Sequence, residues 1–290
     1  VGRSFKYHRP RGFLGSGSEE PNAIVQIIKD KARTEPNIRA TEIEIFEGFE
    51  AKSQNCWPSV NFDLGEINNF LSPLLPAGFY YKTFMWPAKL WKTYEYFIRK
   101  SAGLGVSATE RDPDLYDHKY YHCDVLIIGS GPAGLSAASI AVKSGKKVLL
   151  VDEKPDHGGS LIGSDSELTI INDSNPKDWI NKTLSNLSKN KNIKILNRTS
   201  VAAYHNYNYL IMMQNLTDHL SEVEKQNKIR QRLWKVRAKK VILATGSIER
   251  MMVFDCNDRP GIMLSSAVRK YLNHYGVKCG NNVVIFANND

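Results

Sequence analysis

The stretch CDVLIIGSGPAGLSAASIAVKSGKKVLLVD, residues 123–152, decides the fold of this chain. Residues 124–128 are a short apolar run bounded by glycine, which predicts a buried parallel strand. A turn with the pattern G-x-G-x-x-G follows, and residues 135–143 then place small and apolar side chains at helical spacing. Residues 148–151 form a second apolar run that ends on Asp152. Strand, glycine turn, helix and strand in this order predict a Rossmann-type α/β domain.

The glycines of the turn have separate physical roles. Gly129 permits the tight turn, Gly131 lets a pyrophosphate approach the backbone, and Gly134 lets helix and strand pack closely. The N-terminus of the following helix offers unpaired N–H groups and the positive end of the helix dipole to phosphates. The candidate phosphate site is therefore the whole turn, which comprises Gly129, Ser130, Gly131, Pro132, Ala133 and Gly134.

An acidic pair stands at the end of the second strand. The carboxylate of Asp152 can accept hydrogen bonds from a ribose diol, and Glu153 is the neighbouring candidate for that role. A carboxylate in this place disfavours a 2′-phosphate. The pattern therefore favours NAD or FAD over NADP.

Two later turns are expected to extend the site. Gly158, Gly159 and Ser160 follow the acidic pair, where they either bring backbone amides toward the same dinucleotide or form a plain loop. Residues 240–246, KVILATG, predict a strand that runs into a turn of small residues. These small residues, Ala244, Thr245 and Gly246, would let the backbone close over the dinucleotide near the glycine turn.

The remaining elements of this region are predicted from shorter patterns. Amphipathic spacing predicts helices over residues 177–189 and 265–275. Short apolar runs predict a buried strand at 193–196 and a final buried parallel strand at 282–287. Three further runs read as pieces of an antiparallel meander, at 201–204, 209–213 and 234–236. Asn288, Asn289 and Asp290 stand where a second G-x-G would be, which argues against a second phosphate loop of the usual type.

The first part of the chain predicts a small α+β lobe. Strands are expected at residues 23–28, 41–46 and 60–64. The basic, glycine-rich segment 1–22 either lines an anion site or wraps a partner, or else it is an irregular loop packed by its aromatic residues. The segment 73–100 is rich in aromatic residues and predicts a helix from Pro87 to about residue 101, at a subunit interface or against a neighbouring domain. The expected domains are 1–72, 73–118 and 119–290, with a polar, turn-rich connector at 102–122.

Composition places the chain among ordinary globular proteins. Its 290 residues, of which 42% are hydrophobic and 24% charged, allow about two domains with a sizeable core. The net charge of +9 permits binding to nucleic acid or an anionic membrane, but the lysines are dispersed, which favours a solvated surface. No apolar run is long enough for a transmembrane helix. Both ends are expected to be cut, because the chain begins inside a basic segment and ends directly after a predicted strand.

The four cysteines, Cys56, Cys123, Cys256 and Cys279, lie far apart in the sequence. They form no C-x-x-C pair, which argues against a disulfide framework, a zinc ribbon, a ferredoxin-type cluster or thiol redox chemistry, and suits a reducing cytosol. Cys123 with His118 and His122 could begin a metal site, but Cys123 opens a buried strand and no fourth ligand is near. The sequence offers no general base, nucleophile or metal site, so chemistry is expected from a cofactor or a partner subunit.

The order of these motifs resembles the two-dinucleotide flavoproteins typified by glutathione and thioredoxin reductases. More specifically, the chain resembles the alpha subunits of heterotetrameric bacterial sarcosine oxidases along its whole length. The stretches that carry this resemblance are GRSFKYHRPRG (2–12), EEPNA (19–23), EPNIRAT (35–41), SQNCWPS (53–59), LLPAGFYYKTFMWP (74–87), VDEKPDHGGSL (151–161), ATGSIER (244–250), NDRPGIML (257–264) and VVIFANND (283–290).

The resemblance implies a cytoplasmic complex with beta, gamma and delta subunits, in which this chain binds NAD at the glycine turn and flavins sit largely on the beta subunit. The family reaction is the oxidative demethylation of sarcosine to glycine with O2 as acceptor, which yields H2O2 and passes the one-carbon unit to tetrahydrofolate. The N-terminal lobe would be a partial ferredoxin-like β-grasp domain without its cluster. The competing interpretations are the FAD-binding large subunit of an opine or amino-acid dehydrogenase, a scaffold that binds a dinucleotide structurally, and a basic nucleic-acid binder.

Overall fold

A computed structural model describes residues 12–30, 32–54, 56–59, 61–70, 86–101 and 103–288. These residues form two compact units. The first contains residues up to 113 together with 250–267, and the second contains residues 114–249 and 268–290. Residues 1–11 of the predicted basic segment and residues 73–85 of the predicted aromatic segment lie outside the described residues. The predicted domain boundaries at 72 and 118 stay predictions, although residue 118 lies inside a strand.

The second unit is built on a six-stranded sheet with the order β6-β5-β4-β9-β8-β7. The strands are β4 (Leu115–Ile128), β5 (Val148–Val151), β6 (Ile193–Leu196), β7 (Thr199–His205), β8 (Tyr209–Asn215) and β9 (Ile229–Leu243). β6, β5, β4 and β9 run parallel, whereas β7, β8 and β9 form the antiparallel meander. The predicted α/β fold with an inserted meander is confirmed.

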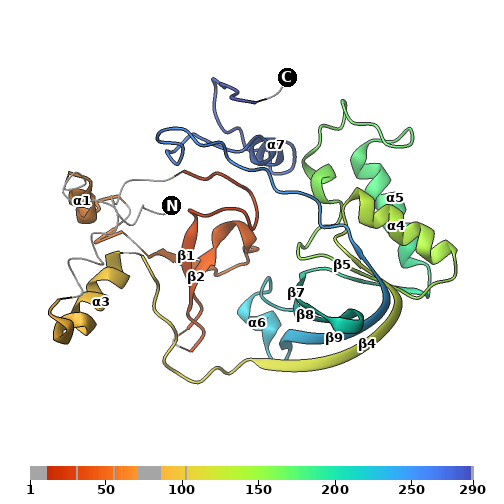
Figure 1. Ribbon diagram of the computed structural model, residues 1–290, viewed down its shortest axis with the longest axis horizontal. Helices are drawn as coiled ribbons and strands as arrows, with labels where there is room; N and C mark the ends of the chain where they lie inside the picture. The colour runs from red at the N-terminus through yellow and green to blue at the C-terminus, as the bar shows by residue number, and fades with distance from the viewer. Residues whose placement is uncertain are drawn as a thin grey trace. The chain divides into compact units, whose positions relative to one another are not determined.

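Two strands are longer than the sequence pattern indicates. β4 begins at Leu115, so the predicted polar connector is wrong over residues 115–122, which are the first half of the strand. The predicted strands at 234–236 and 240–243 are parts of one strand, β9, which pairs with β4 from Leu115↔Ile229 to Ile128↔Leu243. Figure 1 shows β4 and β9 curving side by side. Because each strand supplies the backbone partners of the other, polar residues such as His118 stay extended there.

Helices cover one face of the parallel sheet. α4 (Pro132–Lys143) and α5 (Pro176–Ser188) pack against β4 and β5 through one buried cluster: Ile127, Leu135, Ala138, Val142, Val148, Leu150, Ile180 and Leu187. The opposite face carries a second cluster, which joins the parallel strands to the meander: Cys123, Leu126, Leu149, Val151, Leu196, Leu210, Met212, Trp234, Val236 and Ala238. The sheet is therefore buried on both faces, as its continuous apolar strands require.

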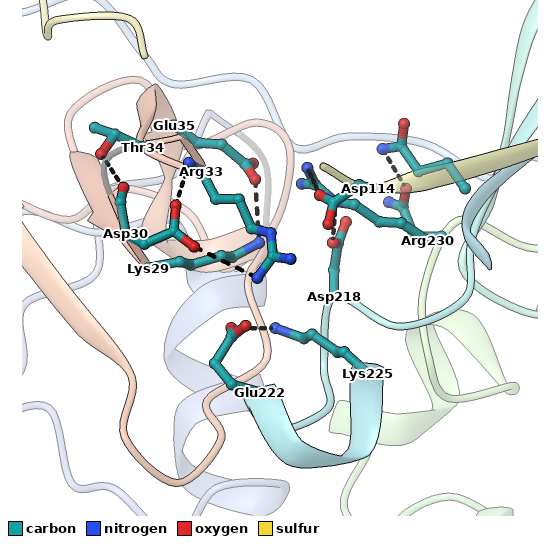
Figure 2. A network of polar contacts seen from close by, with 12 residues as sticks. Lys29, Asp30, Arg33, Thr34, Glu35, Asp114, Asp218, Glu222, Lys225 and Arg230 are labelled. Atoms are coloured by element: carbon teal, nitrogen blue, oxygen red, sulfur yellow. Dashed lines mark hydrogen bonds and ion pairs between the residues drawn. The ribbon is translucent and has the colours of Figure 1, made fainter. Parts of the chain in front are cut away.

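Ion pairs hold the ends of β4 and β9 together. The guanidinium of Arg230 contacts Asp114 Oδ2 through Nη1 at 2.9 Å and Asp218 Oδ1 through Nε at 2.7 Å (Figure 2). Arg232 donates two hydrogen bonds to the carboxylate of Asp117 and lowers the pKa of that carboxyl. The short helix α6 (Glu222–Lys225) and the 3-10 turn η6 (Asn206–Asn208) complete the meander. The charged segment between β8 and β9 thus contains a short helix and supplies Asp218 to the ion pairs of Arg230.

The first unit contains a small antiparallel sheet, β2-β1-β3, of β1 (Ile24–Ile28), β2 (Glu35–Arg39) and β3 (Glu50–Ser53). The turn between β1 and β2 is closed by Asp30, whose Oδ1 accepts the N–H groups of Ala32 and Arg33, and by a contact of Lys29 with Glu35 (Figure 2). Short helical segments follow at η2 (Leu64–Glu66), α1 (Ile67–Phe70), η4 (Ala88–Leu90) and α3 (Trp91–Ser101). The predicted strand at 23–28 and the helix after Pro87 are confirmed.

Three predicted strands are wrong. Residues 41–46 begin inside the 3-10 turn η1 (Ala40–Glu42) and continue without strand pairing, and residues 61–64 form a bend that leads into η2. Residues 282–287 form no strand, and Val284 is 94% exposed. The physical reason is the same each time. An alternating or apolar run becomes a strand only where a neighbouring backbone pairs with it over several residues, and within the described residues these runs have no more than an isolated bridge between Pro58 and Asp63.

The last helix, α7 (Ser265–Asn273), agrees with the helix predicted at 265–275. Asn273 Nδ2 donates to the carbonyl of Gly163, which ends the 3-10 turn η5 (Gly159–Gly163). Within the described residues, no helix has the length and apolar character needed to cross a membrane.

Candidate dinucleotide site

The glycine turn lies between the end of β4 and the start of α4. Gly129 has φ +99°, and its N–H donates to the carbonyl of Val151 at 2.8 Å. A Cβ at this position would overlap the carbonyl oxygen of Ala244, whose N–H in turn donates to Ile128 at 2.8 Å. Glycine is therefore required here both by the left-handed backbone and by the close approach of the turn at 244.

Gly134 and Gly131 show opposite environments. A Cβ at Gly134 would overlap the carbonyl oxygen of Gly129, so the first turn of α4 can lie this close to β4 only with glycine. A Cβ at Gly131 would meet only the Cα of Gly159, at 3.8 Å. The protein therefore leaves open space in front of Gly131, which is where a pyrophosphate is expected to approach.

The N-terminus of α4 is uncapped. Gly131 is the N-cap residue and supplies no side chain, and Pro132 occupies the first turn. The N–H groups of Ala133 and Gly134 precede the first intrahelical hydrogen bond, that from Leu135 to the carbonyl of Gly131 at 2.9 Å. Because these donors point out of a twelve-residue helix, they suit an anionic ligand.

Asp152 turns its carboxylate toward the protein. Its Oδ2 accepts hydrogen bonds from the backbone N–H of Ser130 at 2.6 Å and from the Ser130 hydroxyl at 2.7 Å. Its Oδ1 accepts the N–H of Lys154 at 2.9 Å. With three protein donors, Asp152 orders the glycine turn and the chain after β5. This geometry leaves it little capacity to accept from a ribose.

Glu153 has the opposite character. Its side chain is exposed, and among the described residues it has no hydrogen bond or ion pair. It is the second residue after β5 and lies next to Asp152, the residue that orders the turn. Of the two acids that the sequence offers, Glu153 is thus the one whose carboxylate oxygens are available to an added diol.

His157 is a member of the site that sequence reasoning missed. Its Nδ1 lies 2.8 Å from the Ser130 hydroxyl, which itself donates to Asp152. With the hydroxyl proton directed at Asp152, the imidazole must carry its proton on Nδ1 and donate to Ser130. Burial lowers the pKa of His157. The chain of His157, Ser130 and Asp152 holds the Ser130 side chain away from the open space before Gly131.

The second glycine turn packs on the first. The N–H of Gly158 donates to the carbonyl of Ser130 at 2.9 Å. Gly159 has φ +57°, and a Cβ there would come within 2.8 Å of the Cα of Gly131. Ser160 is exposed at the start of η5. The structure thus brings Gly158 and Gly159 to the glycine turn at 129–134, as the functional interpretation of this corner requires.

The third predicted turn is brought to the site only in part. Ala244 lies close to two positions of the glycine turn. Its carbonyl oxygen lies against Gly129, and its Cβ is 3.5 Å from where a Cβ at Gly134 would be. The Cα of Thr245 would lie 3.2 Å from a Cβ at Gly129. Gly246, with φ +72°, faces open space with no atom within 4 Å. Ala244 and Thr245 therefore form the wall behind the turn, and Gly246 lies beyond it.

The structure opposes a metal site at the start of the core strand. Successive residues of β4 point to opposite faces of the sheet, so His118 and His122 lie on the face away from Cys123. Cys123 is buried, and its burial raises the pKa of the thiol to about 11. No group of three metal-binding side chains comes together in the described residues.

Comparison with known proteins agrees with this geometry. Residues 123–279, more than half of the chain, match the family described as pyridine nucleotide-disulphide oxidoreductase. The chain belongs to the pyridine nucleotide-disulphide oxidoreductase family. The predicted two-dinucleotide flavoprotein class is thereby confirmed, and the family supports a flavin or nucleotide cofactor in general.

Curated relatives match the chain from end to end. The chain is 48% identical to "Sarcosine oxidase subunit alpha" of Rhizobium meliloti (strain 1021) over 100% of its own length and 29% of that protein's. It is 37% identical to the protein of the same name from Corynebacterium sp. (strain P-1), over 100% of its own length and 25% of the relative's. The chain therefore spans between a quarter and a third of the length of these relatives.

Among solved structures, the chain is similar to L-proline dehydrogenase from P. horikoshii. The identity is 24% and the TM-score 0.44, over 60% of this chain and 32% of the other. That likeness is too partial to carry a conclusion.

A second family match covers the first lobe. Residues 1–56 match a 2Fe-2S iron-sulfur cluster binding domain, which agrees with the predicted ferredoxin-like lobe. The cluster itself does not fit. Such clusters are held by four cysteine thiolates, whereas residues 1–56 contain Cys56 alone. Residues 1–56 therefore match a cluster-binding domain without containing its four-cysteine donor set.

Proposed function

We propose that the second unit binds NAD in an extended form across the glycine turn. The pyrophosphate would lie before Gly131, where the N-terminus of α4 and the open space meet. The ribose of the adenosine half would hydrogen-bond to the exposed carboxylate of Glu153, with Asp152 as the residue that orders the turn. This assignment differs from the sequence prediction, which gave the ribose role to Asp152 first and named Glu153 as the neighbouring candidate.

In this proposal the protein contributes binding and orientation, and the dinucleotide, when bound, supplies hydride transfer. Gly129 and Gly134 hold β4, α4 and the turn at 244 together so that the donors of α4 converge. His157 holds the Ser130 hydroxyl toward Asp152. The carboxylate of Glu153 repels a 2′-phosphate, which favours NAD or FAD over NADP.

For the whole protein, we propose the alpha subunit of a sarcosine oxidase. The complex would demethylate sarcosine to glycine with O2 as acceptor, release H2O2 and pass the one-carbon unit to tetrahydrofolate. It would be a cytoplasmic heterotetramer with beta, gamma and delta subunits, and flavins would sit on a partner subunit. The observation that carries this proposal is the 48% identity that extends over the entire chain, both lobes included.

A second candidate is the FAD-binding large subunit of an opine or amino-acid dehydrogenase. The match of residues 1–56 to a cluster-binding domain favours it, since such a lobe would pass electrons to a flavin. The lack of cluster cysteines in that segment opposes it.

Identification of the bound nucleotide tests these proposals. The full-length chain is expressed without partner subunits and denatured, and the released cofactor is analysed by mass and absorbance. We expect NAD without flavin. Stoichiometric FAD would overturn the NAD assignment and favour the dehydrogenase. An empty site in a folded chain would count against both. Oxygen uptake with sarcosine by the assembled complex then tests the reaction separately.

The roles of the two acids give a second test. Glu153→Gln is expected to weaken dinucleotide binding about tenfold, because a neutral amide accepts more weakly from the ribose hydroxyls, and to leave the thermal midpoint unchanged. Asp152→Asn is expected to lower the midpoint by several degrees, because an amide nitrogen would then face the donors of Ser130 or Lys154. Titration calorimetry and thermal melts of both variants measure this. An affinity loss confined to Asp152→Asn would contradict the assignment.

A further inference from the structure

The first unit contains a buried anion in an unusual setting. Glu20 is 0% exposed, and its carboxylate accepts three backbone hydrogen bonds. Its Oε2 accepts from the N–H of Leu14 at 2.6 Å and of Gly15 at 2.7 Å, and its Oε1 accepts from Asn22 at 2.6 Å. All three donors belong to residues 12–22, the glycine-rich loop before β1. This loop is wrapped around one carboxylate.

A second segment of the same unit, residues 258–264, contacts this loop and holds it closed. The N–H of Gly12 donates to the carbonyl of Asp258 at 2.9 Å, and the N–H of Leu264 donates to Leu14 at 2.8 Å. A Cβ at Gly12 would come within 2.8 Å of backbone atoms of Arg259 and Pro260. Residues 258–264 therefore close over the loop on this side.

The family match of this segment bears on the buried Glu20 carboxylate, because residues 1–56 match a 2Fe-2S cluster-binding domain. A cluster with its thiolates is an anion, and hydrogen bonds to its sulfurs tune it. Residues 1–56 contain a single cysteine, yet a loop of backbone donors surrounds a buried negative charge. We propose that the Glu20 carboxylate takes the structural place of the anionic cluster, so that the lobe keeps the loop of an iron–sulfur domain as a redox-silent, iron-free fold.

The geometry makes Glu20 hard to replace. Because donors face both oxygens, a glutamine in either orientation would point its amide N–H groups at one or two backbone N–H groups. Each misdirected donor would be buried without a partner. Glu19 is the matched control. It is the neighbouring acid and accepts a single hydrogen bond, from the N–H of Ser16 to Oε1 at 2.7 Å, in a half-buried position.

Two measurements on the full-length protein test the proposal. In the first, the wild type is incubated anaerobically with ferrous iron, sulfide and a thiol reductant, desalted, and assayed for iron and visible absorbance. We expect neither. Stoichiometric iron and sulfide would overturn the proposal.

In the second measurement, limited proteolysis compares Glu20→Gln with Glu19→Gln. In Glu20→Gln we expect cleavage within residues 12–22 to be at least about tenfold faster than in the wild type. In Glu19→Gln we expect it to stay within about twofold of the wild-type rate.

If Glu20→Gln is insoluble, Glu20→Asp and Glu19→Asp replace the pair. Aspartate keeps the charge but is one methylene shorter, so it cannot reach all three donors. Faster cleavage in Glu20→Asp alone supports the proposal. Equal cleavage in either matched pair contradicts it, because the carboxylate would then be dispensable to the loop. Neither measurement depends on which dinucleotide the second unit binds, so failure here leaves the proposed function standing.

Discussion

Gly134→Ala is expected to abolish dinucleotide binding and to destabilise the second unit. The added Cβ would overlap the carbonyl oxygen of Gly129, a backbone atom that cannot rotate away. Helix α4 must therefore move off β4, at a cost of about 3 kcal/mol or more. Since that movement also disperses the donors at the helix N-terminus, we expect affinity to fall more than about a hundredfold.

Gly131→Ala is the matched control for this prediction. Its Cβ would lie in open space, 3.8 Å from the nearest atom, and its backbone has φ −69°, which alanine adopts readily. We expect stability within about 1 kcal/mol of wild type but binding at least about tenfold weaker, because the methyl group would stand in the path of the pyrophosphate. Thermal melts and calorimetric titration with NAD measure both quantities. Wild-type affinity in Gly131→Ala would refute the placement of the phosphates.

Trp234→Ala is expected to cost about 3–5 kcal/mol of stability. Trp234 is 1% exposed at the centre of the cluster between β4, β8 and β9. Its Nε1 donates to Gln214 Oε1 at 2.9 Å, and Lys194 lies over its ring at 4.7 Å from the centroid. Alanine would leave both a cavity and a buried amide oxygen without its donor.

The control is Tyr120→Ala on the opposite face of β4, where the ring is 71% exposed. Its loss removes a contact with Lys235, whose ammonium lies 5.3 Å from the ring centroid, and is expected to cost about 1 kcal/mol or less. Hydrogen exchange of the β8 and β9 amides distinguishes the two variants. Protection should fall at least about a hundredfold in Trp234→Ala and little in Tyr120→Ala. Similar protection in both variants would contradict the prediction that Trp234 stabilises the meander more than Tyr120 does.

Much of the second unit follows from local sequence. The predicted β6 has the bounds found in the structure, and the helices at α4, α5 and α7 begin and end within a few residues of the predictions. The three helices combine apolar periodicity with glycine or proline at one end, and β6 is a short apolar run between asparagines, so neighbouring residues are enough to specify them. The run at 41–46 alternates just as well, but it forms no strand in the described part of the chain.

In the candidate site, too, some features follow from local sequence and others do not. Glycine positions are predictable because a positive φ or a close backbone approach leaves a mark in the residue type. The direction in which a carboxylate points leaves no such mark in the sequence. Asp152 and Glu153 are adjacent acids, and only the position of Ser130 assigns the first to the turn. His157 was missed because a single histidine before two glycines carries no spacing signal, although its ring reaches Ser130.

By itself, the sequence determined the Rossmann core, the three glycines of the phosphate turn and the absence of a cysteine set in residues 1–56, since each depends on residue type and short-range spacing. Only the tertiary structure decided that β9 is one strand, that Glu153 and not Asp152 is available to a ligand, and that Glu20 gathers a whole loop. These features depend on which backbone donors distant segments bring together, and hydrogen-bond partners of that kind are set by packing.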